Sequence, residues 1–136
     1  MTIVDSSVWI DFLRGTPTRQ VELLKELVRN GNGIIVGDLI LAEVLQGVTS
    51  DQDFDKTHAL LRAFPVVELC GHERAVRAAR NYRLLRRHGV TPRKTIDTLI
   101  ATACLDRGDE LLYSDRDFDP FVEHLGLKSA LKAQPS

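Results

Sequence analysis

Four short runs of apolar, mostly branched residues divide the chain and limit the folds that it can adopt. The runs TIVD, GIIV, FPVVEL and ELLYS are each bounded by Gly, Pro, Asp or Ser, as β-strands usually are. Between them lie longer segments whose apolar residues recur every three or four positions, as in amphipathic helices. Parallel strands need such helical crossovers, and a parallel sheet is covered on both faces. The pattern therefore predicts an α/β fold with a mainly parallel central sheet.

The predicted helices fill most of the remaining chain and are expected to form one domain with the strands. Their segments are 6–14, 18–30, 38–48, 54–64, 72–89, 95–108 and 115–126, with glycines where most of them should end. A length of 136 residues suits one hydrophobic core and is too short for two. We therefore expect a single domain over residues 1–136, with a short loose C-terminal tail from about residue 132.

Composition places the protein among globular proteins without a membrane span. Hydrophobic residues make up 43% and charged residues 27% of the chain. No apolar run approaches the roughly 20 residues of a spanning helix, and no basic leader opens the chain. Cys70 and Cys104 lack the spacing of a zinc site and are expected to be reduced. We therefore expect a cytoplasmic location.

Acidic residues stand at the ends of the first and last predicted strands. Asp5 follows TIV, and Asp115 and Asp117 lie in the segment SDRDF after the last strand. Functional sites of open α/β sheets lie beyond the carboxyl ends of the strands, so these acids are candidate site residues. Each could instead cap the helix that follows it, a role that contributes about 1 kcal/mol.

Two further acids lie within apolar helical segments. Glu43 has almost only apolar neighbours in DLILAEVLQGV, so we expect this helix to be mostly buried. An ionised Glu there needs a partner, a cation or a raised pKa, unless it forms a narrow polar stripe with Gln46. Asp97 lies near the start of TIDTLIATACL, with Thr95 as the expected helix cap. The helix dipole alone could favour an acid at the position of Asp97.

The recurrence of acids in four segments favours a metal site over separate helix caps. Converging carboxylates without matching Lys or Arg partners repel one another unless a cation neutralises them. Carboxylate oxygens suit Mg²⁺ or Mn²⁺ rather than Zn²⁺. Such ions activate water and stabilise a leaving oxygen, so the pattern indicates hydrolysis of a phosphate ester.

The motifs IVDSSVWIDFL, LAEVLQG, TIDTLIAT and LYSDRDFD, in this order and at this separation, resemble those of PIN-domain ribonucleases. The resemblance extends from Ile3 to Phe118 and is closest to the VapC-type toxins of toxin–antitoxin pairs. It implies a three-layer α/β/α sandwich and a metal-dependent endoribonuclease that hydrolyses RNA phosphodiester bonds. The products would carry 5′-phosphate and 3′-hydroxyl ends, because the 2′-hydroxyl need not attack.

The resemblance also implies the roles of individual residues. The catalytic acids would be Asp5, Glu43, Asp97 and Asp115. The ligands of Mg²⁺ or Mn²⁺ would be Asp5, Asp97, Asp115 and Asp117, and whether Asp115 or Asp117 is the closer ligand stays open. Ser7 and Ser114 would orient the carboxylates through hydrogen bonds.

A basic flank precedes the third motif and could contact RNA. Eight Lys and Arg residues between His72 and Lys94 accompany a single acid, Glu73, so this segment carries +7 and the rest of the chain −8. Such charge attracts phosphates, although a solvated helix face would have the same pattern. The candidates for RNA contact are Arg83, Arg86, Arg87, Arg93 and Lys94.

Two protein partners follow from the resemblance. One is a VapB-type antitoxin, which in this family inserts an extended tail towards the acids, and the other is a second copy in a homodimer. Apolar side chains of segments 6–14 and 18–30 could form a groove for the antitoxin, or they could belong to the core. These side chains are Trp9, Phe12, Val21, Leu24 and Leu27.

Other protein classes fit the sequence less well. A haloacid-dehalogenase phosphatase needs a second acid two residues after the strand-end Asp, where this chain has Ser7, and the glycine-rich P-loop motif is absent. Two alternatives stay open. One is a metal- or partner-binding module with a PIN-like fold and no nuclease activity, and the other is a housekeeping PIN nuclease without an antitoxin.

Overall fold

The computed structural model describes residues 1–31 and 33–131 and contains a four-stranded parallel sheet. The strands are β1 (Thr2–Val4), β2 (Ile34–Gly37), β3 (Val66–Val67) and β4 (Glu110–Leu112), in the order β3-β2-β1-β4. All three pairings are parallel, with Val4 opposite Leu112 at the carboxyl ends of β1 and β4. The predicted parallel sheet is therefore confirmed.

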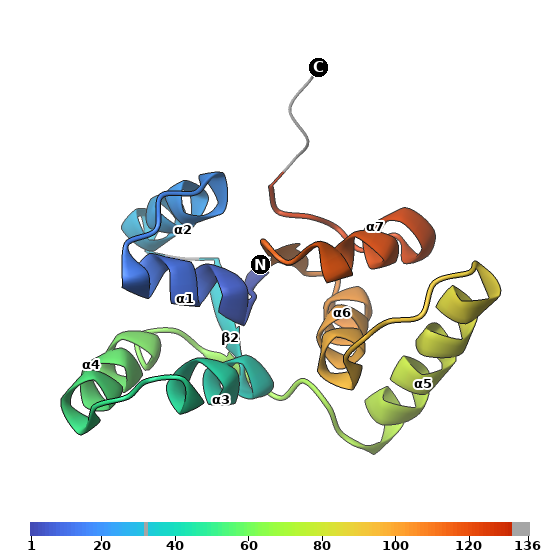
Figure 1. Cartoon of the computed structure of the whole chain (residues 1–136), viewed down its shortest axis with the longest axis horizontal. Helices are drawn as coiled ribbons and strands as arrows, with labels where there is room; N and C mark the ends of the chain where they lie inside the picture. Colours follow the sequence, from blue (N-terminus) through green and yellow to red (C-terminus); the bar gives the residue numbers. More distant parts are fainter. Residues whose placement is uncertain (32, 132–136) are drawn as a thin grey trace.

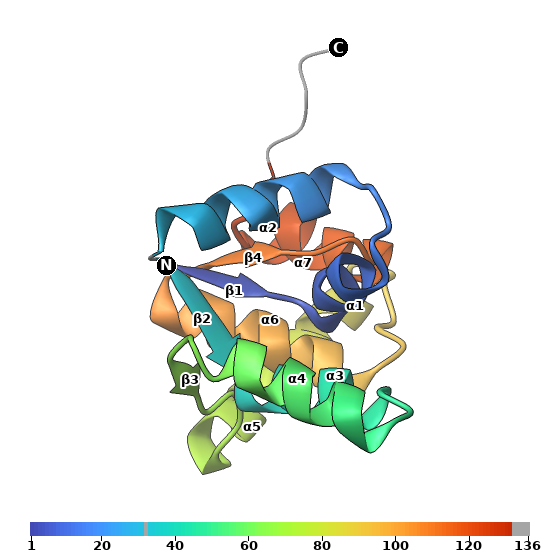
Figure 2. The same ribbon diagram turned by 90° about the vertical axis from the view of Figure 1, so that its left-hand side faces the viewer.

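Helices cover both faces of this sheet, as Figures 1 and 2 show. One face carries α1 (Ser6–Arg14), α2 (Arg19–Asn30), α3 (Asp38–Gln46) and α4 (Asp51–Leu61). The other carries α5 (His72–Arg87), α6 (Thr95–Arg107) and α7 (Asp119–Leu125), with the short 3-10 helix η1 (Arg116–Phe118) before α7. The three-layer α/β/α sandwich is confirmed. Within the described part of the chain, no helix is long and apolar enough to cross a membrane.

The strand order places a crevice between β1 and β4. From β1 the chain passes to β2 and then to β3, always outward in the same direction. The connection from β3 through α5 and α6 then crosses to the other side of β1, where β4 pairs. The chain consequently leaves β1 towards α1 on one face and leaves β4 towards α7 on the other (Figure 1). Such a reversal of strand order opens a crevice at the carboxyl ends of the two strands.

Most apolar side chains of α1 and α2 that could have formed a partner groove are part of the core. Trp9 and Leu24 are 0% exposed and Val21 is 2% exposed. The Trp9 ring packs edge-on against Phe12, with ring centroids 6.2 Å apart, and against Phe64 at 5.7 Å. The interpretation of these residues as a groove for an antitoxin is therefore wrong for Trp9, Val21 and Leu24, because they fill the space between α1, α2 and the sheet.

The helix that carries Glu43 is less buried than its sequence indicates. Of the nine residues of α3, only Ile40 and Val44 are buried, whereas Ala42 and Gln46 are exposed. The prediction of a mostly buried helix is therefore wrong. Its apolar residues pack on one side against α1 and α4, and Glu43 lies half-buried at the border.

The outer edge of β4 is paired rather than open. Leu111 N donates to Lys128 O at 2.9 Å, and Ala130 N donates to Leu111 O at 2.9 Å. The segment after α7 thus protects the edge strand from pairing with other chains. The loose tail expected from about residue 132 lies outside the described residues, and the single domain over residues 1–136 stays a prediction.

We predict that Gly37→Ala destabilises the protein. Gly37 ends β2 next to the start of α3, and an added Cβ would overlap the side chain of Leu69, which is 0% exposed. Overpacking of this kind should lower the free energy of unfolding by about 1–3 kcal/mol. Urea denaturation measures the loss. At the control position Gly47 the added Cβ would lie 3.7 Å from Val44 O, so Gly47→Ala should change stability far less, and equal effects would contradict the prediction.

Candidate active site

The crevice between β1 and β4 gathers acids from three parts of the chain. Asp5 follows β1 directly and donates its backbone N–H to Leu112 O of β4 at 2.8 Å. Asp115 follows β4 after two residues, and Asp97 lies in the first turn of α6. Parallel pairing of β1 with β4 makes their carboxyl ends neighbours, so residues far apart in sequence converge there.

Three carboxylates form a compact group. One oxygen each of Asp97, Asp115 and Asp117 lies within 4.8 Å of the other two. Asp97 is buried, and the other two are half-buried. The Asp115 side chain also accepts a hydrogen bond from the backbone N–H of Asp117 at 2.9 Å, so Asp115 caps η1 and borders the crevice at the same time. A helix cap and a position at the candidate site are therefore compatible for Asp115.

Asp5 caps the helix that follows it and lies at the crevice outside the group of three. Its Oδ2 accepts the backbone N–H of Ser7 at 3.1 Å, which caps α1, and the Ser7 hydroxyl at 2.6 Å. Ser7 Oγ in turn accepts the backbone N–H of Ser114 at 3.3 Å. Ser7 therefore connects the exit of β1 to the exit of β4 and orients the Asp5 carboxylate between them.

Ser6 is a site residue that the sequence interpretation missed. Its hydroxyl donates to Glu43 Oε1 at 3.3 Å and so connects α1 to α3 beside the acids. The signal was present in the sequence, because Ser6 is one of two consecutive hydroxyl residues directly after Asp5. Only the packing of α1 against α3 shows that this hydroxyl faces Glu43.

Burial and mutual repulsion raise the pKa values of three acids at the crevice. Burial, and next the charge of Asp5, raise the pKa of Asp97 to about 7. Burial also raises the pKa of Asp5, against the hydrogen bonds from Ser7. The pKa of Glu43 is raised by burial and by Asp5. Three carboxyl groups with raised pKa values in one crevice mark a candidate functional site.

The start of α6 adds positive potential to the crevice. Lys94, not Thr95, precedes the helix, and no side chain caps it, so the predicted cap at Thr95 is wrong. The free amides and the helix dipole therefore face the first turn, where Asp97 lies. Lys94 Nζ also lies 3.8 Å from Asp115 Oδ2, although this exposed pair offsets little of the acids' repulsion.

The donor set fits a hard divalent cation. Among the described residues, Asp97 Oδ2 and Ser114 Oγ are buried without a hydrogen-bond partner, an arrangement that is costly unless another group binds there. The neighbouring donors are carboxylate oxygens, and no His or Cys belongs to the group of three. Oxygen donors of this kind suit Mg²⁺ or Mn²⁺.

Comparison with known proteins decides the family. A model of the PIN domain matches residues 2–122. This chain belongs to the PIN-domain family. Ribonuclease VapC11 of Mycobacterium tuberculosis is 28% identical to it over 131 residues, which cover 96% of this chain and 98% of VapC11.

Solved structures share the fold of this PIN domain. VapBC2 from Rickettsia felis, in a complex with a DNA fragment from its promoter, aligns with a TM-score of 0.71 at 16% identity, over 94% of this chain and 96% of the other. FitAcB from Neisseria gonorrhoeae aligns with a TM-score of 0.72 at 17% identity, over 95% and 96% of the two chains. These alignments extend over nearly the whole described chain and support the same architecture.

The basic flank of the PIN domain divides into paired and free parts. Arg74 and Arg77 bind the carboxylate of Asp106 on α6, at 3.1 and 2.7 Å. Farther along α5, three exposed arginines line one shallow pocket. Arg93 is exposed in the connection to α6, next to Lys94. The three arginines of the shallow pocket are Arg83, Arg86 and Arg87.

We predict that Asp97→Asn stabilises the metal-free PIN domain at neutral pH. The folded state raises the pKa of Asp97 from 3.8 to about 7, so it holds this proton more tightly than the unfolded chain does. Stability from this proton is present at low pH and is lost as the pH rises towards 7. In EDTA, Asp97→Asn should therefore melt above the parent at pH 8, with a smaller difference at pH 5.

Asp106→Asn is the matched control on the same helix. Hydrogen bonds from Arg77 and Arg74 lower the pKa of Asp106, so its charge stabilises the fold above the ordinary carboxyl range and the variant should melt below the parent at pH 8. Thermal melts between pH 5 and 8 show whether each variant melts above or below the parent. Parallel pH profiles for parent and Asp97→Asn would contradict the burial and repulsion described for Asp97.

Proposed function

We propose that this PIN domain is a metal-dependent endoribonuclease and the toxin of a toxin–antitoxin pair. The observation that carries the proposal is the group formed by Asp97, Asp115 and Asp117, with a buried carboxylate oxygen that has no partner within the described chain. The similarity to Ribonuclease VapC11 over 96% of the chain supports ribonuclease chemistry. The solved relatives that form VapBC and FitAB complexes support an antitoxin partner.

Asp97, Asp115 and Asp117 would hold Mg²⁺ or Mn²⁺, with Asp5 as a further ligand beside them. When bound, the ion supplies charge that polarises a phosphate and lowers the pKa of a water molecule. Asp5 approaches the group with its Oδ2 fixed by Ser7, so it needs little reorganisation to bind. The raised pKa of Asp97 makes cation binding depend on pH, because the cation must displace the proton that burial favours.

Glu43 would orient the attacking water. Its Oε1 accepts the Ser6 hydroxyl at 3.3 Å, which leaves the other carboxylate oxygen available for a water molecule. The half-buried position gives Glu43 access to solvent, unlike Asp5 and Asp97. Ser7 and Ser114 act as positioning residues, since Ser7 connects Asp5 to the backbone of Ser114.

Positive charge at the rim would attract the RNA strand. Lys94 lies beside Asp115, where it can pair with a phosphate when the acids bind a cation. Arg93 precedes it, and the arginines at 83, 86 and 87 form a second patch on α5. Arg74 and Arg77 are less available, because Asp106 already pairs with both. Contacts of this kind to phosphates position RNA without reading its sequence.

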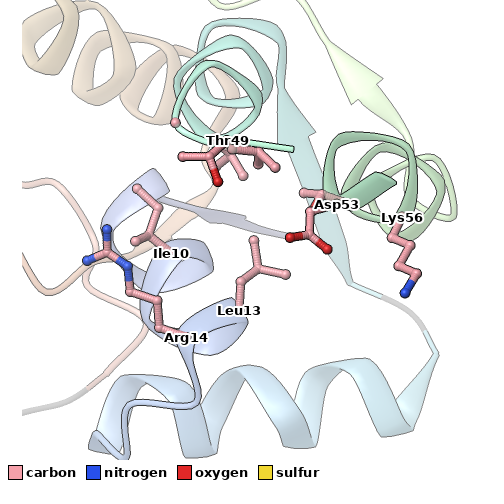
Figure 3. A pocket seen from close by; sticks show the side chains of 10 residues that line it. Ile10, Leu13, Arg14, Thr49, Asp53 and Lys56 are labelled. Atoms are coloured by element: carbon pink, nitrogen blue, oxygen red, sulfur yellow. The ribbon is translucent and has the colours of Figure 1, made fainter. Parts of the chain in front are cut away.

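A groove beside α1 offers a surface for the antitoxin (Figure 3). It has a volume of about 550 Å³ and lies between α1 and the segment from the end of α3 into α4. Its apolar floor includes Ile10, Leu13 and Val44, and Leu13 is 41% exposed. Arg14 and Lys56 lie at its border and could pair with acids of a partner. An amphipathic segment of a VapB-type protein would bury this floor. The homodimer and the cytoplasmic location stay predictions.

Cleavage of RNA should require the divalent ion and the acids. The test uses protein purified free of antitoxin, incubated with total RNA and Mg²⁺ or Mn²⁺, with EDTA as the blank. Ser7→Ala should lower the rate roughly 10- to 100-fold, as loss of a ligand-orienting hydrogen bond usually does, and Asp5→Asn and Asp97→Asn should lower it further. The downstream fragments should carry a 5′-phosphate, so an RNA ligase should join an added oligonucleotide to that end.

Asp106→Asn serves again as the control, because it removes a carboxylate from α6 outside the acidic group and should leave cleavage unchanged. If Asp5→Asn and Asp97→Asn cut RNA as well as the parent, the site assignment is wrong. If the folded parent cuts no RNA with either ion, the chain is a binding module instead of a nuclease.

Leu13→Asp should weaken neutralisation by the antitoxin while RNA cleavage by the free protein stays unchanged. A charge on the apolar floor would be buried without a partner when the complex forms. Titration of the cleavage reaction with the product of a neighbouring small reading frame measures the effect. Val66→Asp, at a 51% exposed apolar position on β3, is the control, and equal inhibition of parent and Leu13→Asp would exclude this groove.

A further inference from the structure

A second groove lies between α5 and the first turns of α6, the helix that carries Asp97. It has a volume of about 410 Å³, and α5 and α6 lie side by side along it (Figure 1). Ala75, Ala79 and Tyr82 line it from α5, where their spacing places them on one face of the helix. The opposite wall includes Thr95 and Thr98 of α6. The volume lies within the roughly 300–1,000 Å³ of small-ligand sites.

One buried polar atom of this groove has no partner among the described residues. Thr98 is 2% exposed, and its hydroxyl makes no hydrogen bond to any described residue. A buried hydroxyl without a partner costs about 1–3 kcal/mol, so such atoms usually belong to binding sites or to ordered water. Because Thr98 lines the groove, a ligand there with a hydrogen-bonding edge would satisfy the hydroxyl.

The charges around the groove connect it to the acidic group. Arg83 lines the groove and also the shallow pocket that it shares with Arg86 and Arg87. Thr95, on the opposite wall, follows Lys94, whose ammonium lies 3.8 Å from Asp115 Oδ2. Cations therefore border the groove on both helices, and no acid lines it among the residues that the structure describes. This arrangement suits a planar apolar group attached to a chain of phosphates.

Tyr82 supplies the aromatic surface that such a group needs. The Tyr82 side chain lines the groove, and the Arg86 guanidinium lies 6.0 Å from its ring centroid. An aromatic ring with a neighbouring arginine is a common stacking platform for unpaired bases of nucleic acids. The exposed alanines leave room beside the ring, since Ala75 and Ala79 have short side chains.

We propose that this groove binds one unpaired nucleobase of the RNA strand, next to the phosphate that reaches the acidic group. The inference rests on the proposed ribonuclease function and adds a determinant of cleavage-site choice. The base would stack on Tyr82, accept or donate a hydrogen bond at the Thr98 hydroxyl, and place its flanking phosphates near Arg83 and Lys94. A helix of a protein partner fits less well, because the groove spans only about two helical turns from Ala75 to Tyr82.

The experiment first maps the cut sites of the parent protein on single-stranded RNA oligonucleotides with Mg²⁺ or Mn²⁺. The same oligonucleotides are then made with an abasic ribose at each position flanking the cut. At one position, loss of the base should lower kcat/KM of the parent about 10- to 100-fold, as expected for one stacked base. The same abasic substitution should lower kcat/KM of Tyr82→Ala much less than it lowers kcat/KM of the parent. Tyr82→Phe should show the same loss as the parent.

Thr98→Val separates a binding role from a structural one. The variant replaces an unpartnered hydroxyl by a methyl group of similar size, so the melting temperature should stay the same or rise. A fall in kcat/KM with unchanged folding therefore assigns the hydroxyl to the substrate. Ala79→Leu, which fills the groove, should raise KM and change the preferred cut sites. Phe54→Ala, at a 39% exposed aromatic on α4, controls for loss of an exposed ring.

The outcomes separate this inference from the proposed function. If the parent cuts RNA but the abasic penalty is absent, or is equal in parent and Tyr82→Ala, the nucleobase site is wrong and the nuclease stands. If Ala79→Leu dissociates a dimer in light scattering, the groove belongs to a second copy and the inference is overturned. If the folded parent cuts no RNA, both proposals fail.

Discussion

The parallel pairing of β1 with β4 is the constraint on which the rest of the site depends. The hydrogen bond from Asp5 N to Leu112 O joins the two strands where they end, and Ser7 Oγ continues the connection to the backbone of Ser114. Because the chain then turns towards opposite faces, the crevice stays open while its walls are fixed. Without this pairing, the acids at the two strand ends would lie on separate loops.

The scaffold holds carboxylates together at a cost in stability. Burial and the charge of Asp5 raise the pKa of Asp97 to about 7, and the nearest cation, Lys94, is exposed. Two other features stabilise the fold and offset this repulsion. One is the continuous apolar core under both helical layers. The other is the uncapped start of α6, whose dipole favours an acid in its first turn. Strain that a metal ion can relieve is typical of sites whose purpose is binding rather than folding.

The charge pattern has a different meaning in three dimensions than along the chain. Segment 72–94 carries +7 by count, yet Asp106 of α6 pairs with Arg74 and Arg77 and removes them from the free surface. The remaining exposed cations divide into a patch on the second half of α5 and the residues before α6. An apolar groove that contains Tyr82 borders both sets, and an aromatic ring beside cations is an arrangement that binds single-stranded nucleic acids.

The sequence by itself determined the alternation of strands and helices, the acids at the ends of β1 and β4, and the family motifs, because these depend on local periodicity and turn chemistry. Periodicity and turn chemistry alone do not separate Asp5 from Asp38, which also follows a strand, and only the family motifs favoured Asp5. Asp38 accepts hydrogen bonds from the backbone N–H groups of Leu39 and Leu69 at 2.8 and 3.0 Å and so connects the start of α3 to the segment after β3. Only the strand order, through contacts between distant segments, decided which strand-end acid meets the carboxylate of Asp97. The same contacts buried Trp9 and opened the groove between α5 and α6, since helix faces become core or surface only after the layers pack.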